Sequence, residues 1–411
     1  SDLFVNLVST VYISLLATTT GQTFNTNGVS MPFNITIGGG SGAYYTLGSN
    51  LNLTASNSNF TVSNGTFNIG SYTTTSSRFY VNTSTTLVSS NGTVTCNGTG
   101  VATGSTLFTH TSATVSGNIT IVYSSSATAG TTYSLIAEQT YNVNITSGSY
   151  TVGVSGTVNN LDFTGFTGSS YAGWYIAGNL TLSSGMTTIV SASAGKFLGS
   201  STSVIRTNGV TVNSPIEFSG TGTYQLYDNL TLGSTSKATF FSGTLDLNSK
   251  TLTCGVFYTG NSTTAKTIAF GASGAITCTY YGNGVNYTFY VPEAVAYLTL
   301  TGSKTVNLTY SGANDSYIQT NASLSTPTKA ASFNLNVTAG TYTLYWKPSP
   351  FDNINFTGFS GTFRTGGGGT QFYIFGDLTL SSSMLFYPGS ISWYFEATSG
   401  TQTITSNGDR K

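Results

Sequence analysis

Two phrases recur in the same order in this chain, and their repetition constrains the fold more than any other feature. "LDFTGFTG" begins at Leu161 and "INFTGFSG" at Ile354, an offset of 193 residues. "GNLTLSSGM" at Gly178 and "GDLTLSSSM" at Gly376 lie 198 residues apart. A chain that repeats long phrases at a nearly fixed interval is built from repeated structural units.

Asn-Gly pairs mark the ends of the repeat. They end at Gly28, Gly209 and Gly408, and "ATTTGQTFNTNG" (17–28) aligns without a gap on "ATSGTQTITSNG" (397–408). The sequence therefore predicts two long repeats of nearly equal length, begun and ended in mid-unit. The predicted division is 1–28, the strand-rich end of a preceding repeat and a possible assembly segment; 29–209, repeat 1; 210–408, repeat 2; and 409–411, a charged terminus.

The composition predicts an all-β fold. Only 6% of the residues are charged, and the Lys and Glu that make surface helices are scarce, while 13% are aromatic. Short alternating runs such as "YQLYDNLTL" (224–232) are separated by Gly, Asn or Ser, which favour turns. Such runs recur every eight to twelve residues or so, as expected of many short strands.

Two architectures fit this rhythm, an elongated parallel β-helix (β-solenoid) and a string of tandem β-sandwich modules. In a β-solenoid each turn, or rung, stacks on the last, so identical side chains meet. Stacked Asn, Thr and aromatic residues stabilise such ladders, whereas stacked charges repel. A chain that repeats those residue types and avoids charge favours the β-solenoid.

"GNLTLSSGM", "SGTLDLNSKTLT" and "LDFTGFTG" resemble the repetitive β-helical shafts of bacteriophage tail-fibre and tail-spike proteins, especially those of environmental viral sequences. The resemblance is one of repeat style and covers essentially the whole chain. It implies a structural role and an extracellular, cell-surface or virion-surface location. These motifs specify a rung and neither a receptor nor a substrate.

Charge and hydropathy narrow the partners. The formal net charge is zero and Lys/Arg clusters are lacking, so nucleic acid is not an expected partner. "LFVNLVSTVYISLLA" (3–17) is interrupted by polar residues and is too short for a membrane-spanning helix. We expect no membrane span.

The sequence lacks a constellation typical of catalysis, and we expect no enzyme activity, cofactor or metal site. The acids stand alone in sequence. Asp228 and Asp246 lie about one rung apart and are the pair that stacked rungs bring closest, but turn acids are their ordinary interpretation. His110 is the only histidine, and we expect it at the surface. A polysaccharide-degrading tail-spike enzyme remains a minor alternative.

The cysteines occupy related places. Cys96 and Cys278 are equivalent in the two repeats, and Cys254 precedes Cys278 by 24 residues. Cys254 and Cys278 are therefore expected to face each other on neighbouring rungs, as buried thiols or as a disulfide.

The leading functional hypothesis is a stiff structural fibre protein whose partner is another copy of itself. Because the two ends match, the last rung of one copy can seat the first rung of the next, head to tail, and such a contact grows a filament. The matching ends also fit a piece of a longer array. The predicted assembly residues are Leu3, Phe4, Val5, Leu7, Val8, Val11, Tyr12, Ile13, Leu15 and Leu16.

The alternative is a cell-surface adhesin that binds surface glycans. Exposed Trp174, Trp346 and Trp393 would stack on sugar rings, although aromatic residues of a solenoid more often belong to the core. Ice binding is a further possibility, because "TLT" pairs can form flat ladders, but the pairs are irregularly spaced along the chain.

Overall fold

The structure is a computed structural model of the 411-residue chain. It describes residues 11–83, 85–110, 113–260, 263–280, 287–292, 295–320, 327–347, 349–365, 371–397 and 399–408. Strands supply almost all regular structure there, and the helical segments are two single turns, η1 (Val295–Tyr297) and η2 (Lys329–Ala331). Among these residues there is no helix of the length and hydropathy needed to cross a membrane.

Both compact units of the chain, Ser1–Ile189 (unit 1) and Val190–Lys411 (unit 2), are parallel β-solenoids. The strands are short and alternate between buried and half-buried residues, as in β7 (Gly65–Gly70), because one face of each strand lines the core. Every strand pairing of the described residues is parallel, which confirms the β-solenoid and excludes antiparallel β-sandwich modules.

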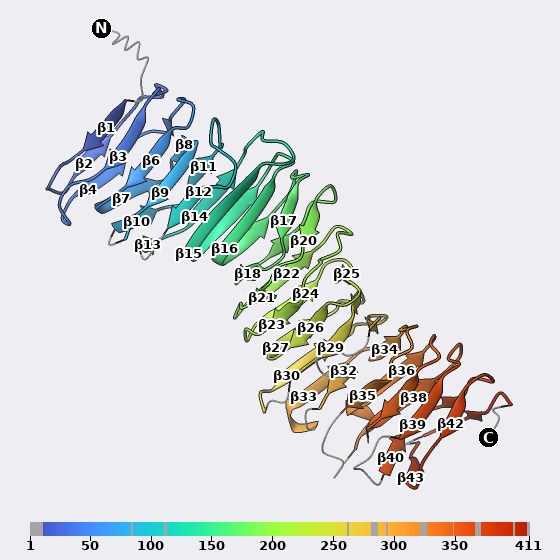
Figure 1. The fold of residues 1–411 in the computed structure, drawn as a ribbon. Helices are drawn as coiled ribbons and strands as arrows, with labels where there is room; N and C mark the ends of the chain where they lie inside the picture. Colours follow the sequence, from blue (N-terminus) through green and yellow to red (C-terminus); the bar gives the residue numbers. More distant parts are fainter. Residues whose placement is uncertain are drawn as a thin grey trace. The chain divides into compact units, whose positions relative to one another are not determined.

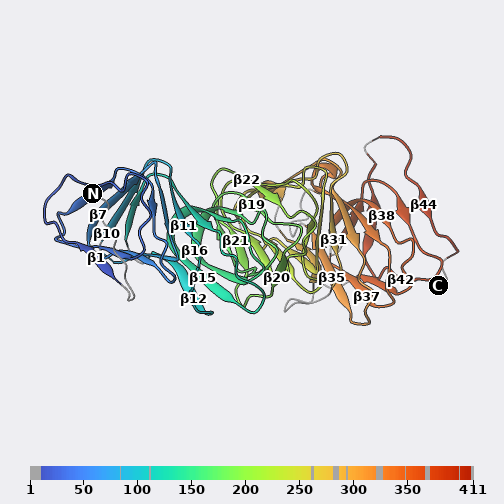
Figure 2. The same ribbon diagram turned by 90° about the horizontal axis from the view of Figure 1, so that it is seen from above.

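Unit 1 winds through three columns of stacked strands, A, B and C, in cyclic order along the chain (Figures 1 and 2). Column A contains β1 (Tyr12–Leu15), β3 (Asn34–Ile37), β6 (Asn59–Val62), β9 (Arg78–Val81), β12 (Ser105–His110), the first parts of β15 (Thr132–Ile145) and β16 (Thr151–Asp162), β17 (Ser169–Tyr171) and β20 (Thr187–Ile189). Column B contains β2 (Gln22–Phe24), β4 (Tyr44–Leu47), β7, β10 (Thr85–Ser89) and β13 (Thr114–Ser116). Column C contains β5 (Leu51–Asn52), β8 (Thr73–Ser76), β11 (Gly92–Cys96), β14 (Ile119–Tyr123), the second parts of β15 and β16, β18 (Tyr175–Ile176) and β19 (Leu180–Thr181).

Unit 2 repeats the arrangement with its own three columns (Figure 1). Column A contains β21 (Gly195–Phe197), β23 (Ile216–Phe218), β26 (Lys237–Phe240), β29 (Val256–Tyr258), β32 (Tyr287–Val291), β35 (Ser316–Thr320), β37 (Thr343–Trp346), β39 (Thr362–Thr365) and β42 (Leu385–Tyr387). Column B contains β22 (Thr202–Arg206), β24 (Thr223–Leu226), β27 (Gly243–Asp246), β30 (Lys266–Ala269) and β33 (Leu298–Thr301). Column C contains β25 (Leu230–Thr231), β28 (Thr251–Cys254), β31 (Ala275–Cys278), β34 (Thr305–Leu308), β36 (Phe333–Val337), β38 (Pro350–Asn355), β40 (Gln371–Ile374), β41 (Leu378–Thr379), β43 (Ser392–Phe395) and β44 (Ile404–Thr405).

Like residues stack on like inside the core. Phe60 pairs with Phe79 and Phe79 with Phe108, so these two successive rungs differ in length. The rings of Phe60 and Phe79 lie 5.0 Å apart at an interplanar angle of 17°, and those of Phe79 and Phe108 lie 6.0 Å apart at 14°. Each ring therefore packs against the same ring type one rung away, which stabilises the stack without any charge.

The repeated phrases lie where column C divides. In unit 1, β16 pairs with β18 through Thr157 and with β19 through Leu161. In unit 2, β38 pairs with β40 through Phe351 and with β41 through Ile354. One strand thus supports two shorter strands at the same place in each repeat. "LDFTGF" and "INFTGF" end the supporting strand, and "GNLTL" and "GDLTL" form one of the two that follow.

The two divisions of the chain describe different properties. The compact units meet at Ile189 and Val190, whereas the repeat boundary read from the sequence lies at Gly209. The same turn recurs at all three repeat ends, because Asn27, Asn208 and Asn407 adopt φ values of 51°, 49° and 51°. The repeat is therefore a repeat of local structure.

Candidate functional site

Column C presents two parallel rows of mostly polar side chains, chiefly Thr and Asn, on its outer surface in unit 1. We call these rows the unit 1 polar strip. One row consists of Thr73, Thr93, Thr120, Asn142, Asn160 and Asn179, and the other of Thr75, Thr95, Val122, Asn144, Asp162 and Thr181. Strand alternation produces the rows, since the residues between them, such as Val143 and Leu161, are buried.

Hydrogen bonds between amides fix the orientation of the asparagines in this strip. Asn142 Oδ1 accepts hydrogen bonds from Asn159 Nδ2 at 2.9 Å and from Asn160 Nδ2 at 2.7 Å. Asn160 Oδ1 in turn accepts one from the Asn179 backbone N–H at 2.8 Å. Each amide is thus held by the neighbouring rung, which is the ladder that stacked asparagines favour.

The glycine of the "GNLTL" phrase makes room for this ladder. A Cβ at Gly178 would lie 2.6 Å from Asn160 Oδ1 and 2.9 Å from the Asn159 backbone oxygen. A Cβ at Gly376, its equivalent in unit 2, would lie 2.2 Å from Asn353 Oδ1. Distances this short are repulsive, so the repeated phrase requires glycine wherever an asparagine amide crosses the backbone of the next rung.

The unit 1 polar strip is hollowed between β14 and β19. The hollow has a volume of about 350 Å³ and is lined by Thr120, Asn142, Asn144, Asn160, Leu161, Asp162, Asn179 and Thr181. Asp162 supplies the one charge in this lining. Its Oδ1 accepts hydrogen bonds from the Thr164 N–H at 2.8 Å and from Thr164 Oγ1 at 2.6 Å, and no described residue donates to its Oδ2. The lining therefore offers amides, hydroxyls and a carboxylate oxygen to a ligand.

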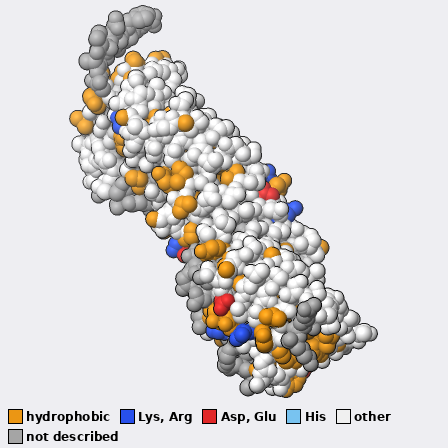
Figure 3. Space-filling model, turned by 45° about the vertical axis from the view of Figure 1, so that its right-hand side comes forward, with side chains coloured by type: hydrophobic (Ala, Val, Ile, Leu, Met, Phe, Trp, Pro, Cys, Tyr) orange, Lys and Arg blue, Asp and Glu red, His pale blue; other side chains and the backbone are white. Residues whose placement is uncertain are grey.

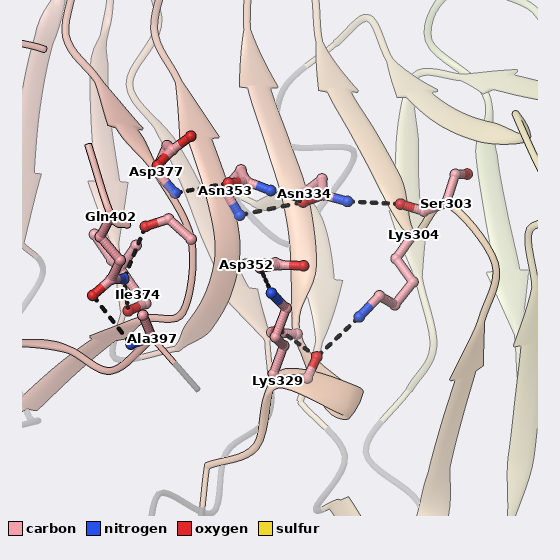
Figure 4. Close-up of polar contacts among 12 residues, drawn as sticks. Ser303, Lys304, Lys329, Asn334, Asp352, Asn353, Ile374, Asp377, Ala397 and Gln402 are labelled. Carbon is pink, nitrogen blue, oxygen red and sulfur yellow. Dashed lines mark hydrogen bonds and ion pairs between the residues drawn. The ribbon is translucent and has the colours of Figure 1, made fainter. Parts of the chain in front are cut away.

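Unit 2 carries an equivalent strip. Its rows consist of Thr305, Asn334, Asn353, Asp377 and Thr403, and of Thr231, Thr253, Thr277, Asn307, Asn336, Asn355, Thr379 and Thr405. Figure 4 shows Asn334, Asn353 and Asp377 in a line: Asn353 Nδ2 donates to Asn334 Oδ1 at 2.8 Å, and the Asp377 N–H donates to Asn353 Oδ1 at 2.7 Å. The ladder is thus built twice.

Charged groups flank the unit 2 strip (Figure 4). Lys329 Nζ lies 3.3 Å from Asp352 Oδ1, and Lys304 Nζ donates to the Lys329 backbone oxygen at 2.9 Å. Burial lowers the pKa of Lys304, although the negative charge of Asp352 raises it and so offsets part of the effect. These contacts tie the short segment η2 to β38, through Asp352, and to the start of β34, through Lys304.

Few side chains of the chain are charged, 6% of its residues. On the face that Figure 3 shows, a few Lys, Arg, Asp and Glu side chains lie among side chains that are mostly uncharged. Among the described residues, no three His, Cys, Asp or Glu side chains gather where they could hold a metal ion.

The predicted assembly segment is described in part. Leu3, Phe4, Val5, Leu7 and Val8 lie outside the described residues, and Val11 is half-buried. In and next to β1, Tyr12 and Leu16 are 63% and 67% exposed, and Ile13 and Leu15 are half-buried. The described part of the segment therefore presents apolar side chains at the first described rung.

The tryptophans proposed to stack on sugars belong to the aromatic core. Trp174 is 2% and Trp346 0% exposed, so neither ring is open to a ligand from solvent in this structure. Trp174 Nε1 donates to Ser170 Oγ at 3.1 Å. Trp393 is half-buried and stacks on Phe372, with ring centroids 5.1 Å apart. The alternative interpretation of solenoid aromatics, as core residues, holds for Trp174 and Trp346.

His110 is buried, and the prediction that it lies at the surface is wrong. The register of β12 shifts between Thr106 and Phe108, so Leu107 and Phe108 both point inward. This bulge reverses the alternation that follows and turns His110 into the core, where its ring meets that of Tyr141 edge to face at 5.5 Å.

The cysteines lie where the repeat places them. Cys254 and Cys278 are register partners in β28 and β31, which confirms that they face each other on neighbouring rungs. All three cysteines are buried free thiols. Burial raises the pKa of both Cys96 and Cys254, so neither is set up as a reactive thiolate.

Asp228 and Asp246 act as turn and ladder acceptors. Asp228 accepts hydrogen bonds from the Thr207 and Asn208 backbone N–H groups of the preceding rung, at 2.8 and 2.6 Å. Asp246 accepts from Gln225 Nε2 at 2.8 Å and from the Asn248 N–H at 2.9 Å. Both acids already satisfy backbone donors, as their interpretation as turn acids predicts.

The regularity of the polar strips was missed because it is spatial. Rungs of different length scatter the Thr and Asn pairs along the chain, but strand pairing brings them into register. Irregular spacing of the Thr pairs along the chain is therefore not a valid argument against ice binding. The rows nevertheless mix Asn, Asp and Val with Thr, so they do not form the uniform Thr face that ice binding needs. Superposing "NVN" (142–144), "NLD" (160–162) and "NLT" (179–181) would have revealed the rows.

Comparison with protein-family models, with curated proteins and with solved structures finds no match for this chain.

Proposed function

We propose that the protein is a structural β-solenoid that associates with further copies of itself through its end rungs. The observation that carries the proposal is the state of these rungs. Phe386 of β42 and Trp393 of β43 are half-buried, although Phe363 and Phe372, on which they stack, are fully buried. The last described rung of unit 2 thus exposes part of a core that every inner rung covers.

The first described rung of unit 1 is open in the same way. Ile13 and Leu15 of β1 are half-buried, whereas their register partners Ile35 and Ile37 are 0% exposed. Among the described strands, β1 pairs only with β3 and β2 only with β4. Unpaired strand edges with apolar side chains are templates for pairing with another chain.

The two end rungs are equivalent in sequence. Residues 17–28 align on 397–408, which places β2 beside β44; the same offset places β1, which precedes the aligned segment, on β43. Pairing β43 and β44, the two last strands of divided column C, with β1 and β2 of the next copy would continue the parallel stacking of strands from one copy to the other. This contact joins two different surfaces and does not close on itself, so the assembly grows into a filament.

A fibre of this kind belongs on an extracellular, cell or virion surface, as in the tail-fibre shafts that the repeat resembles. The near absence of charge favours stacking of the last rung of one copy on the first rung of the next, because few like charges meet at this contact between copies.

Electron microscopy and sedimentation velocity over a range of protein concentrations test the proposal. The wild-type chain should form filaments whose length rises with concentration. Leu16→Lys and Ile404→Lys place a charge at side chains that are 67% and 59% exposed, and each should keep the particles short. Val190→Lys is the matched control, since Val190 is 67% exposed and lies outside the end strands. Monomers at every concentration, or filaments of both end variants, would count against it.

A further inference from the structure

We propose that the hollow of the unit 1 polar strip binds a neutral polysaccharide that lies along the strip, across successive rungs. The residues that contact it are Asn144, Asn160, Asp162, Asn179 and Thr181. This inference rests on the hollow of the unit 1 polar strip alone. It is independent of whether the chain forms filaments.

The lining has the hydrogen-bonding capacity that sugar hydroxyls require. A hydroxyl both donates and accepts, and an asparagine amide offers two donors and two acceptor positions. Asn160 uses one donor on Asn142 and accepts the Asn179 N–H, so it keeps a second donor for a ligand. Asp162 Oδ2 adds an acceptor, and Asn144 adds a further amide. No described residue makes a hydrogen bond with either group, so both are open to a ligand.

Part of the lining is also held in place before a ligand arrives. Asn160 Nδ2 donates to Asn142 Oδ1, and Asn160 Oδ1 accepts the Asn179 backbone N–H, so the Asn142 and Asn160 amides have a fixed orientation. A ligand therefore binds to Asn160 without the entropy cost of ordering that side chain.

The charge of the lining selects a neutral ligand. It contains no Lys or Arg to pair with a carboxylate, sulfate or phosphate, and Asp162 repels an anion. Nucleic acids and acidic polysaccharides are thereby disfavoured. A single carboxylate beside amides suits the paired hydroxyls of an uncharged sugar.

The repeat of the strip suits a polymer. Parallel strands place equivalent side chains about 4.8 Å apart from rung to rung, and alternate residues of one strand lie roughly 7 Å apart. Hydroxyl groups of a polysaccharide also recur at a fixed interval along its length. Beyond the hollow, one row continues from Thr120 to Thr93, and the other passes Val122 before it reaches Thr95, so further sugar units would meet further hydroxyls.

Aromatic stacking is a weaker route to sugar binding in this chain. Two pairs of half-buried tyrosines in unit 2 stack on one another: Tyr317 and Tyr345 lie 4.8 Å apart at 16°, and Tyr258 and Tyr290 lie 5.1 Å apart at 11°. Their faces cover each other, and a sugar needs a free ring face. The polar hollow is the better site.

A glycan array of neutral and acidic saccharides, followed by affinity electrophoresis in dextran, laminarin, mannan, galactan and alginate gels, tests the proposal. We expect retardation by at least one neutral polysaccharide and none by alginate. Asn144→Ala with Thr181→Ala should weaken binding at least tenfold, because each removes a lining group that takes no part in the amide ladder. Asp162→Asn keeps an acceptor for Thr164 and should weaken binding less.

The control is Thr36→Ala with Thr61→Ala. These residues are register partners on the outer face of column A, half-buried like Asn144 and Thr181, and their loss should leave retardation unchanged. Circular dichroism checks that each variant is folded. Three outcomes overturn the proposal: no neutral saccharide binds, alginate binds as well as the neutral polymers, or the groove and control variants lose affinity equally.

Discussion

Single glycines carry much of the information in the repeated phrases. In "FTGF", Gly165 has a φ of 89° and Gly358 a φ of 95°. A Cβ at these positions would lie 2.7 Å from the Thr146 backbone oxygen and 2.6 Å from that of Thr338, one rung below. The phrase is thus a left-handed turn pressed onto the preceding turn, and glycine alone satisfies both conditions.

Replacing Gly165 by alanine should destabilise the protein more than replacing Gly130. Both residues have φ near 90°, but a Cβ at Gly130 would have no heavy atom within 4 Å. Gly130→Ala should cost about 1 kcal/mol for the left-handed backbone alone. Gly165→Ala adds the clash with Thr146 and should cost a total of more than about 2 kcal/mol. Chemical denaturation of the two variants measures the difference, and equal losses would contradict the steric argument.

Two buried tyrosines should respond in opposite directions to loss of the hydroxyl. No described residue makes a hydrogen bond with the Tyr141 hydroxyl, which is buried, whereas Tyr224 donates to the Phe197 backbone oxygen at 3.2 Å. Tyr141→Phe should be neutral or stabilise by up to about 1 kcal/mol, because an unsatisfied polar group leaves the core. Tyr224→Phe should destabilise by about 1 kcal/mol. The free energy of unfolding in urea gives both values.

At the level of elements, the stacking of β28 on β31 determines the chemistry of the cysteines. Cys254 pairs with Cys278, and Cys96 occupies the corresponding inward position of β11. A polar thiol reagent should modify none of the three cysteines in the native protein and all three after unfolding, because burial both blocks access and raises the pKa of Cys96 and Cys254. Rapid modification of a native thiol would show that the rungs open locally.

Strand faces were predictable from sequence, but their alignment between rungs was not. Alternation in runs such as "YQLYDNLTL" (224–232) predicted short strands, and the repeat predicted the meeting of Cys254 with Cys278. A single bulge in β12 was enough to reverse the expected position of His110. The candidate groove was missed, because its register shows only when "NVN" (142–144), "NLD" (160–162) and "NLT" (179–181) are superposed, and rungs of unequal length elsewhere in unit 1 obscure that spacing.

At the level of the whole molecule, the long repeat of the sequence reflects the place where one column of strands divides into two. Column C supports two strands in both units, β18 and β19 in unit 1 and β40 and β41 in unit 2. Each long period of the sequence therefore contains one such division, and the rung is the smaller unit inside it. Repeat proteins of this kind gain stability from contacts between neighbouring units.

The pH dependence of stability should be flat near neutrality and steep in alkali. Only 6% of the residues are charged, so few groups titrate between about pH 5 and pH 9, and the melting temperature should change little there. Burial raises the pKa of Tyr141, Tyr150 and Tyr342, and raises that of Tyr224 to about 12. A tyrosine whose pKa is raised on folding contributes stability in full below its unfolded pKa of about 10 and loses it as the pH rises through the folded value.

Stability should accordingly fall from about pH 10 upward, as the unfolded chain releases phenolic protons that the folded chain retains. Melting followed by circular dichroism from pH 5 to pH 12 measures this profile. Tyr141→Phe removes one of the responsible groups, so its stability should fall less steeply than that of the wild type above pH 10, while the two profiles run parallel below pH 9. A shift of tens of degrees between pH 5 and pH 9 would mean that ionised groups, and not stacked uncharged side chains, hold the rungs together. An alkaline profile unchanged by Tyr141→Phe would show that this buried phenol keeps its proton in the unfolded chain as well.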